Sequence, residues 1–390
     1  MKNIVLLLCL STAFISCNDN GHSSSTEENK HTVTTTDKEV TSLSIPFTAR
    51  TYYKQFEGTI ANEPVVVYLQ KHDSTISGSY YYKKTGRPIS INGSVNNDTL
   101  SLEENDNTAY YNNKNSNPVW KYVFNGNTLS GKWINSGTKK TFDISLKETE
   151  GAYFFEMKEF SDSMVAFDND AKSPKAYSAY QFPWMTGDNE TAGWFNNETR
   201  KMLSLEEGDL PAAIQKEDDS FFANYRKEIA DLKKDYDGDD YLGSWSYDQS
   251  AVNNIQYNAN GFVVIENNTY AYMGGAHGNY AGIYYNYDVA NKKLLKLDDV
   301  IAIDSNSLQK ILEQCFRKDY NLPESKPLTE IIFEKQLATT DNFYITEKGL
   351  GFLYNPYEIA SYAQGQMEVF VPYNLLSNYF TADFKKRMNL

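Results

Sequence analysis

The sequence predicts two regions of different fold class. The first is an all-β antiparallel meander, either a small barrel or a sandwich, and the second is α+β. Over residues 50–148, short runs rich in β-branched and aromatic residues recur about every ten residues and are separated by turn clusters. After residue 150, apolar residues at helical spacing alternate with further strand-like runs. The change of pattern places a boundary near residue 150.

Composition supports folded domains and argues against one class of partner. The chain has 390 residues, 41% of them hydrophobic and 23% charged, which is typical of soluble globular domains with a core. The formal net charge is −14. A strongly acidic chain gains nothing from the counterion release that drives nucleic-acid binding. We therefore expect no nucleic-acid partner.

The N-terminal residues predict a location in the cell envelope. A basic start is followed by the apolar run Ile4–Ile15, which describes a secretory signal too short to span a bilayer. Phe14 to Cys17 resembles a bacterial lipobox, so we expect a signal peptide at 1–16 and palmitate or other acyl chains on Cys17 that anchor the chain to a membrane. Ordinary cleavage that leaves a free thiol is the alternative. The expected location is the cell envelope, outside the cytoplasm and in the periplasm, with the anchor in the inner or the outer membrane.

Residues 17–48 are expected to form the lipidated start and a flexible tether, because they are rich in Ser, Thr, Asn and Glu. An all-β domain is expected at 49–149. Its strand-like runs are 65–69, 76–83, 89–95, 99–102, 120–124, 128–134 and 142–146. Asn- and Gly-rich turns separate these runs, which favours an antiparallel meander. No later run approaches the ~18 apolar residues of a transmembrane helix.

Two helices are predicted in the second region. Apolar residues from Phe221 to Tyr236 follow helical spacing, with Asp219 or Ser220 as the expected N-cap. Leu308 to Phe316 show the same spacing and place Cys315 on the apolar stripe, where a buried and inert thiol is expected. Strands are predicted at 262–266, 269–273, 280–289 and 367–371.

A search for catalytic and metal-binding motifs yields little. The four histidines lack the spacing of helix-borne metal ligands, and the sequence contains neither a nucleophile elbow nor a P-loop nor a dinucleotide fingerprint. The acidic run 235–240 would need Gly and Glu where Asp240 and Ser246 stand, so it is interpreted as a solvated turn and not a calcium loop. We expect no cofactor, no metal and no catalytic residue.

A glycine-rich stretch is the most distinctive feature of the second region. Gly274, Gly275 and Gly278 surround His277, and Asn279 follows directly. Three glycines permit backbone conformations that other residues avoid, so this stretch is expected to close a hairpin with His277 at its tip. The flanking tyrosines are Tyr270, Tyr272 and Tyr280. Two interpretations remain open, a recognition loop and a tight structural turn.

That stretch, together with residues 284–288, 293–299 and the motif 355–360, is similar to one family. The family is the extracytoplasmic domain of unknown function shared by lysozyme-sensing anti-sigma factors of the RsiV type and peptidoglycan deacetylases of the PdaC type. The resemblance covers 150–390 and implies a companion domain at 150–245 and the RsiV-like C-terminal domain at 246–390. It also adds Tyr357 and Glu358 to the expected ligand-binding residues. The chain has Ser361 where the family often has proline, and it lacks both the metal-dependent deacetylase residues and an anti-sigma segment.

Three functions follow as hypotheses. The leading one is a lipid-anchored, non-catalytic envelope protein that binds peptidoglycan or a basic wall-active protein such as lysozyme, since an acidic surface attracts basic partners. The first alternative is a glycan hydrolase with paired carboxylates, Glu358 or Asp288 assisted by His277, which requires a separation of about 5–9 Å. The second alternative is a structural or assembly lipoprotein.

Overall fold

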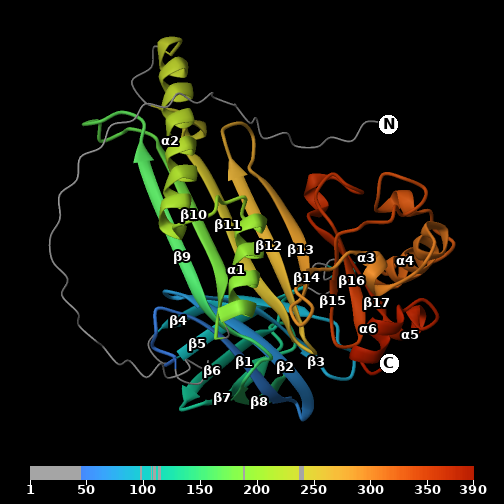
Figure 1. Ribbon diagram of the computed structural model, residues 1–390. Coiled ribbons are helices and arrows are strands. Elements are labelled where there is room, and N and C mark those ends of the chain that lie inside the picture. Colours follow the sequence, from blue (N-terminus) through green and yellow to red (C-terminus); the bar gives the residue numbers. More distant parts are fainter. Residues whose placement is uncertain are drawn as a thin grey trace, which may run out of the picture. The chain divides into compact units, whose positions relative to one another are not determined.

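The computed structural model describes residues 45–96, 99–106, 108, 111–112, 116–187, 189–236 and 241–390, all within one unit, 39–390. The predicted signal, Cys17 and most of the tether lie outside the described residues, as do Asp237 to Asp240 of the acidic run. The described part is mostly β, with a few helices (Figure 1).

An eight-stranded antiparallel barrel forms the N-terminal part, which settles the choice between barrel and sandwich. Consecutive strands pair as a meander, and β1 pairs with β8 to close it. The strands are β1 (Thr51–Ile60), β2 (Glu63–His72), β3 (Thr75–Tyr82), β4 (Ile89–Asn96), β5 (Thr99–Asn105), β6 (Val119–Asn125), β7 (Thr128–Ile134) and β8 (Thr141–Thr149).

Alternation along the strands fills the barrel interior with apolar side chains. Val65, Val67 and Leu69 of β2 point inward and are fully buried. Trp120 of β6 does the same. Glycine is required where two strands approach closely, because a Cβ at Gly131 would lie 2.1 Å from the carbonyl oxygen of Lys121. The period-2 pattern of the sequence thus translates directly into a closed core.

A buried ion pair also lies within the barrel. The Lys54 Nζ is 2.6 Å from Glu148 Oε1, and both side chains are at most 2% exposed. Burial lowers the pKa of Lys54 and raises the pKa of Glu148, although each partner opposes the shift of the other. The pair is therefore costly to break from one side, since a lone charge would remain in the core.

A six-stranded sheet follows the barrel, in the order β14-β13-β12-β11-β10-β9. Its strands are β9 (Phe154–Val165), β10 (Lys175–Thr186), β11 (Tyr247–Ala259), β12 (Phe262–Tyr272), β13 (Asn279–Asp288) and β14 (Lys293–Leu294). All neighbours are antiparallel except β10 and β11, which run parallel because α1 (Asn189–Met202) and α2 (Leu210–Lys234) connect them.

Helix α2 contains the predicted apolar spacing but begins earlier than expected. Asp209, and not Asp219 or Ser220, is the N-cap, and its side chain accepts a hydrogen bond from the Ala212 N–H at 3.1 Å. Phe222, Tyr225 and Ile229 of α2 pack with Ala176 of β10. The helix therefore covers one face of the sheet (Figure 1).

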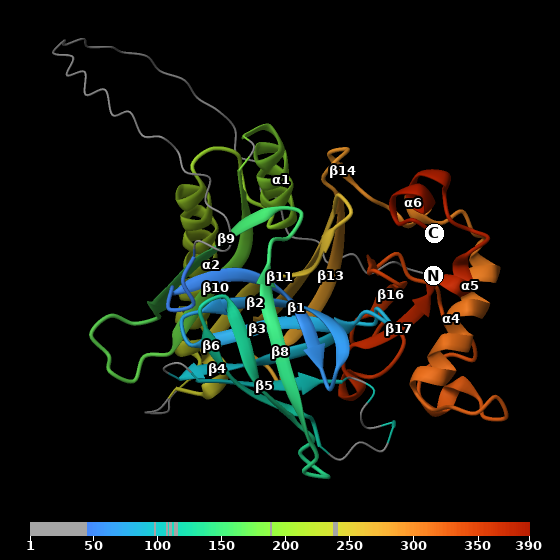
Figure 2. The ribbon, with the colours of Figure 1, turned by 90° about the horizontal axis from the view of Figure 1, so that it is seen from below.

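The barrel and the sheet share a core. Tyr53 and Tyr68, on the outer surface of the barrel, pack with Phe155 of β9 and Val263 of β12. The Gln70 side chain bridges the two sheets, since its Oε1 accepts from the backbone N–H of Ile255 at 3.1 Å. Figure 2 shows the barrel strands and the sheet from below.

The C-terminal part contains a small antiparallel sheet, β15 (Phe343–Ile345), β16 (Gly349–Tyr354) and β17 (Met367–Pro372). The helices around it are α3 (Leu297–Val300), α4 (Ser305–Asp319), α5 (Tyr373–Leu376) and α6 (Ala382–Arg387), with the short 3₁₀ turns η3 (Leu328–Glu330) and η4 (Tyr362–Gln364). Another 3₁₀ turn, η2 (Gly243–Trp245), precedes β11 and packs with α2. Cys315 is buried on α4, and burial raises the pKa of its thiol to about 11, which keeps the thiol inert.

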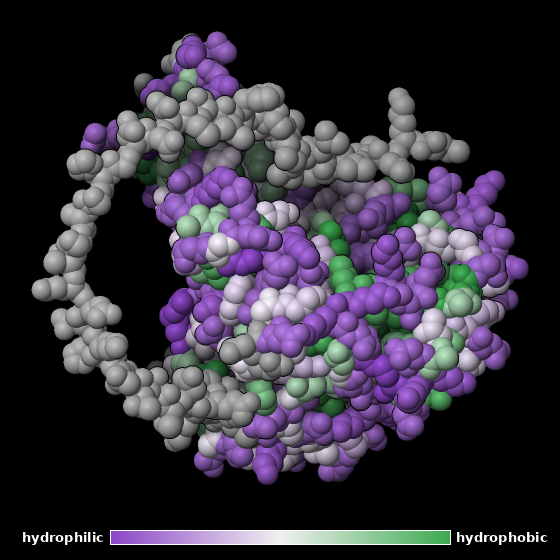
Figure 3. Space-filling view, viewed as in Figure 1, coloured by the Kyte–Doolittle hydropathy of each residue, from purple (hydrophilic) through white to green (hydrophobic). Residues whose placement is uncertain are grey.

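The two sheets are joined through an asparagine. Asn286 of β13 donates to the carbonyl oxygen of Phe343 at 2.7 Å and accepts from the N–H of Ile345 at 2.9 Å. Among the described residues, no helix is both long and apolar enough to cross a bilayer. The face in Figure 3 is mostly hydrophilic, in agreement with the acidic composition.

Candidate functional site

The glycine-rich stretch is the loop of the β12–β13 hairpin. Gly274 and Gly275 have φ of +85° and +93°, in the left-handed region that favours glycine. The Tyr272 hydroxyl donates to the carbonyl oxygen of Gly275 at 3.0 Å. A Cβ at Gly278 would lie 2.5 Å from the Tyr270 ring, so the ring lies directly over this glycine. The loop is therefore an ordered turn, and contacts with its glycines hold Tyr270 and Tyr272 in place.

A second loop, residues 355–366 between β16 and β17, lies beside this hairpin. Asn355 holds it there, because its Oδ1 accepts from the Gly282 N–H at 2.7 Å and its Nδ2 donates to the Gly282 carbonyl at 3.1 Å. Gln366 Nε2 donates to the same Oδ1 at 3.1 Å. The Asn355 side chain thus pairs with β13 as a neighbouring strand would.

Tyr362 joins the two loops. Its ring stacks on His277 with centroids 4.0 Å apart, meets the edge of Tyr280 at 5.6 Å and lies 5.8 Å from Tyr357. Its hydroxyl donates to the carbonyl oxygen of Gly278 at 2.8 Å. We call Tyr270, His277, Tyr280, Tyr357 and Tyr362 the aromatic patch.

The aromatic patch is accessible to a partner. Tyr270 is 39% exposed and Tyr357 is 56% exposed, His277 is exposed, and Tyr280 and Tyr362 are half-buried. Rigid rings held by stacking lose little conformational entropy when they bind. The arrangement is suited to stacking on a flat ligand surface.

Most of the residues expected to bind ligand lie in or next to the aromatic patch. Some of them stabilise the loops by hydrogen bonds within the loop. Glu358 is exposed, and its carboxylate accepts from the Asn355 N–H at 2.9 Å, which closes its own turn. Asn279 is exposed at the start of β13. The sequence did not single out Tyr362. A signal that could have indicated it is its position two residues after the motif 355–360 and three residues before Gly365.

The carboxylates of the hydrolase hypothesis do not all meet. Asp288 stands at the opposite end of β13 from the hairpin, nine residues beyond Asn279 and therefore about 30 Å along the strand. Its side chain pairs with Arg387 and accepts from Asn291. Asp288 is a buried structural acid and lies far from His277.

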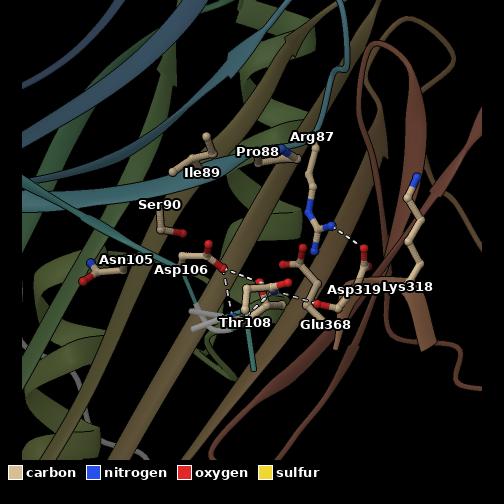
Figure 4. Close-up of a pocket in the computed structure, with 11 residues that line it drawn as sticks. Arg87, Pro88, Ile89, Ser90, Asn105, Asp106, Thr108, Lys318, Asp319 and Glu368 are labelled. Atoms are coloured by element: carbon tan, nitrogen blue, oxygen red, sulfur yellow. Dashed lines mark hydrogen bonds and ion pairs between the residues drawn. The ribbon is translucent and has the colours of Figure 1, made fainter. Parts of the chain in front are cut away.

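A separate cleft of about 540 Å³ lies between the barrel and the C-terminal part (Figure 4). Arg87 Nη1 is 2.6 Å from Asp319 Oδ1, and Glu368 of β17 lies beside them. Burial raises the pKa of Glu368, and Arg87 opposes that shift. Asp106 on the barrel side accepts from the N–H and the hydroxyl of Thr108.

Sequence reasoning missed this cleft because its residues come from the β3–β4 and β5–β6 connections, α4 and β17, which only the fold brings together. Its best-defined acid, Asp319, is already paired with a cation. Within the described ranges, no group of three or more His, Cys, Asp or Glu side chains could hold a metal ion.

Comparison with known proteins identifies one part of the chain. Residues 296–374 match the family described as Protein of unknown function (DUF3298). No curated protein matches the chain significantly.

Two solved structures match part of this chain. A DUF3298 family member from Bacteroides fragilis has a TM-score of 0.55 and 22% identity, covering 61% of this chain and 98% of its own. A DUF3298 family protein from Pseudomonas aeruginosa has a TM-score of 0.41 and 17% identity, covering 59% and 96%. The matched segment runs from just before α3 to the start of α5, and it contains η4 with Tyr362 and Tyr357 of the aromatic patch. Residues 296–374 are therefore a DUF3298 family domain.

Proposed function

We propose that this chain is a lipid-anchored, non-catalytic protein of the cell envelope that binds a cell-wall glycan or a basic wall-active protein such as lysozyme. The aromatic patch is the observation that carries the proposal. Two loops far apart in the sequence place five aromatic side chains on one accessible surface, with ring contacts of 4.0–5.8 Å around Tyr362. Such surfaces commonly stack on sugar rings or anchor protein partners.

Two further observations support the class of ligand. The net charge of −14 favours encounter with a basic protein. The similarity of the second region to the extracytoplasmic domains of RsiV-type sensors and PdaC-type deacetylases implies contact with wall glycan or with an enzyme that cleaves it. A hydrolase remains the alternative. The distance between Asp288 and His277 weighs against a hydrolase. A hydrolase needs two carboxylates close together, and Asp288 lies too far from His277 to be one of them.

Binding can be tested with one patch variant and one matched control. Tyr357→Asn removes an exposed ring at a residue with φ of +70°, a conformation that asparagine tolerates. Tyr177→Ser removes a ring that is 44% exposed, against 56% for Tyr357, from β10, outside the patch. We expect the first variant to lose about tenfold or more in affinity, as for an interface hot spot, and the control to bind as the wild type.

The measurement is calorimetric titration of each chain, without its signal peptide, against lysozyme and against soluble peptidoglycan fragments in separate arms. The arm that binds identifies the ligand. Equal losses in Tyr357→Asn and Tyr177→Ser would show that the patch is not the site. If neither ligand binds the wild type, the proposed function is wrong.

Anchoring is tested independently. Cys17→Ser removes the expected acylation site, so this variant should move from the membrane fraction to the soluble fraction of the producing bacterium. Cell fractionation combined with mass spectrometry of the N-terminal peptide checks it. Unchanged partition of the variant, with no acyl mass on the wild-type peptide, would exclude a lipid anchor.

A further inference from the structure

One mouth of the barrel contains a cavity of about 700 Å³, a volume in the ordinary range of small-molecule sites. Its wall includes Tyr82, Trp133, Glu104, Asp106 and Thr138. An eight-stranded barrel is just wide enough to hold one small ligand at its end. The cavity lies in the barrel and not in the DUF3298 domain, so it is separate from the aromatic patch.

Glu104 of β5 is the central group of this cavity. It is 7% exposed, and its Oε1 accepts three hydrogen bonds, from the Tyr80 hydroxyl at 2.6 Å, Trp120 Nε1 at 2.9 Å and Trp133 Nε1 at 2.5 Å. Three donors on one oxygen fix the side chain in a single orientation. Among the described residues none donates to Oε2, which leaves that oxygen available for a ligand.

The charge of the cavity selects the sign of that ligand. A buried carboxylate normally has a cationic partner, yet the described residues that line the cavity include no Lys, Arg or His. An anion would be repelled here, and a neutral ligand would leave the charge of Glu104 without a counterpart.

Aromatic walls complete the site. The Tyr80 ring lies 4.8 Å from the Trp120 ring and 5.6 Å from the Tyr82 ring, measured between centroids. These contacts hold Tyr80 and Tyr82, which both line the cavity, in fixed orientations. Tyr82 and Trp133 are only half-buried, so parts of their rings remain accessible where they line the cavity. Ring faces attract cations, and indole does so most strongly.

We propose that the barrel mouth binds a small organic ammonium ion, with the cation between Glu104 Oε2 and the rings of Tyr82 and Trp133. The site would belong to the barrel alone and does not depend on the function proposed for the aromatic patch.

The test uses a probe and its uncharged counterpart on the mature full chain. Choline and 3,3-dimethyl-1-butanol have the same shape and differ in charge, so their affinities separate a cation site from an apolar one. We expect choline to bind at least about tenfold more tightly, with a change in tryptophan fluorescence because Trp133 lines the cavity and Trp120 donates to Glu104 Oε1. Acetate should not bind.

Two variants test the residues. Glu104→Gln keeps an oxygen acceptor for the three donors and removes the charge, so it should weaken choline binding about tenfold while the melting temperature confirms folding. Tyr82→Leu removes one ring and should weaken binding severalfold. Tyr357→Asn, in the aromatic patch, is the control and should bind choline as the wild type does.

Several results would overturn the proposal. These are equal binding of the uncharged isostere, unchanged choline affinity in both cavity variants, binding of acetate, and no saturable choline signal. Since lysozyme and glycan binding are measured with Tyr357→Asn, a failure of the barrel site and a failure of the patch are distinguishable.

Discussion

Burial raises the pKa of the Glu368 carboxyl on β17, and the Arg87 guanidinium beside it opposes this shift. The folded protein therefore takes up this proton at a higher pH than the unfolded chain does. It follows that the free energy of unfolding rises as the pH falls through the folded pKa towards the ordinary value of about 4.3. The ionised form of Glu368 is therefore less favourable in the folded protein than in the unfolded chain.

We expect Glu368→Gln to raise the melting temperature at pH 7.5, because glutamine resembles the protonated acid, and the gain to shrink towards pH ~4.5. Thermal melts across this range check it, with Glu324→Gln, an exposed residue after α4, as the control. A lower melting temperature of Glu368→Gln at pH 7.5 would mean that attraction to Arg87 outweighs burial.

At the residue scale, the sequence singled out four of the five residues of the aromatic patch and missed Tyr362. Gly274, Gly275 and the tyrosines around His277 were recognisable because glycines with positive φ and flanking aromatic residues leave a local pattern. Tyr362 was not recognisable, since its contact with His277 joins positions 85 residues apart in the sequence. The Arg87–Asp319 pair was hidden for the same reason, as no local pattern links β3–β4 to α4.

The β12–β13 hairpin offers a test at the scale of the element. Gly275 has φ of +93° and open space around its Cα, so an added Cβ meets conformational strain and no clash. We expect Gly275→Ala to lower the free energy of unfolding by about 1 kcal/mol. Urea denaturation measures it.

The matched control is Gly193→Ala, the same substitution in helix α1, where the Cβ would also meet no atom within 4 Å. This variant should gain about 0.5–1 kcal/mol, because alanine favours the helix. A stabilised Gly275→Ala variant would contradict the left-handed conformation of the hairpin loop.

Elements with a clear period were predictable, and those without one were not. Helix α4 and seven of the eight barrel strands were predicted from their apolar spacing, and β1 was not. Strands β9 and β10 were missed. Charged residues such as Lys158 and Asp162 interrupt any alternation in β9, and Pro183 argues against a strand in β10. Helix α1 was missed too, because its apolar residues are few and spaced too widely to form a stripe.

At the scale of the whole molecule, the sequence left open those features that depend on the pairing of strands far apart in the chain. Short strands with tight turns fit a barrel and a sandwich equally well, and only the pairing of β1 with β8 decides between them. The parallel pairing of β10 with β11 likewise depends on how α1 and α2 pack across the sheet. Local sequence carries little information about either event.

Closure of the barrel has a consequence for aggregation. Exposed strand edges are templates on which another chain can add a strand, and closure removes two of them. The six-stranded sheet ends in β14, with two residues, and in β9, which carries charged residues such as Glu156 and Lys158 at its edge. Short or charged edges discourage such addition. The barrel and the six-stranded sheet therefore offer neighbouring copies little edge to join, even where many copies are crowded together.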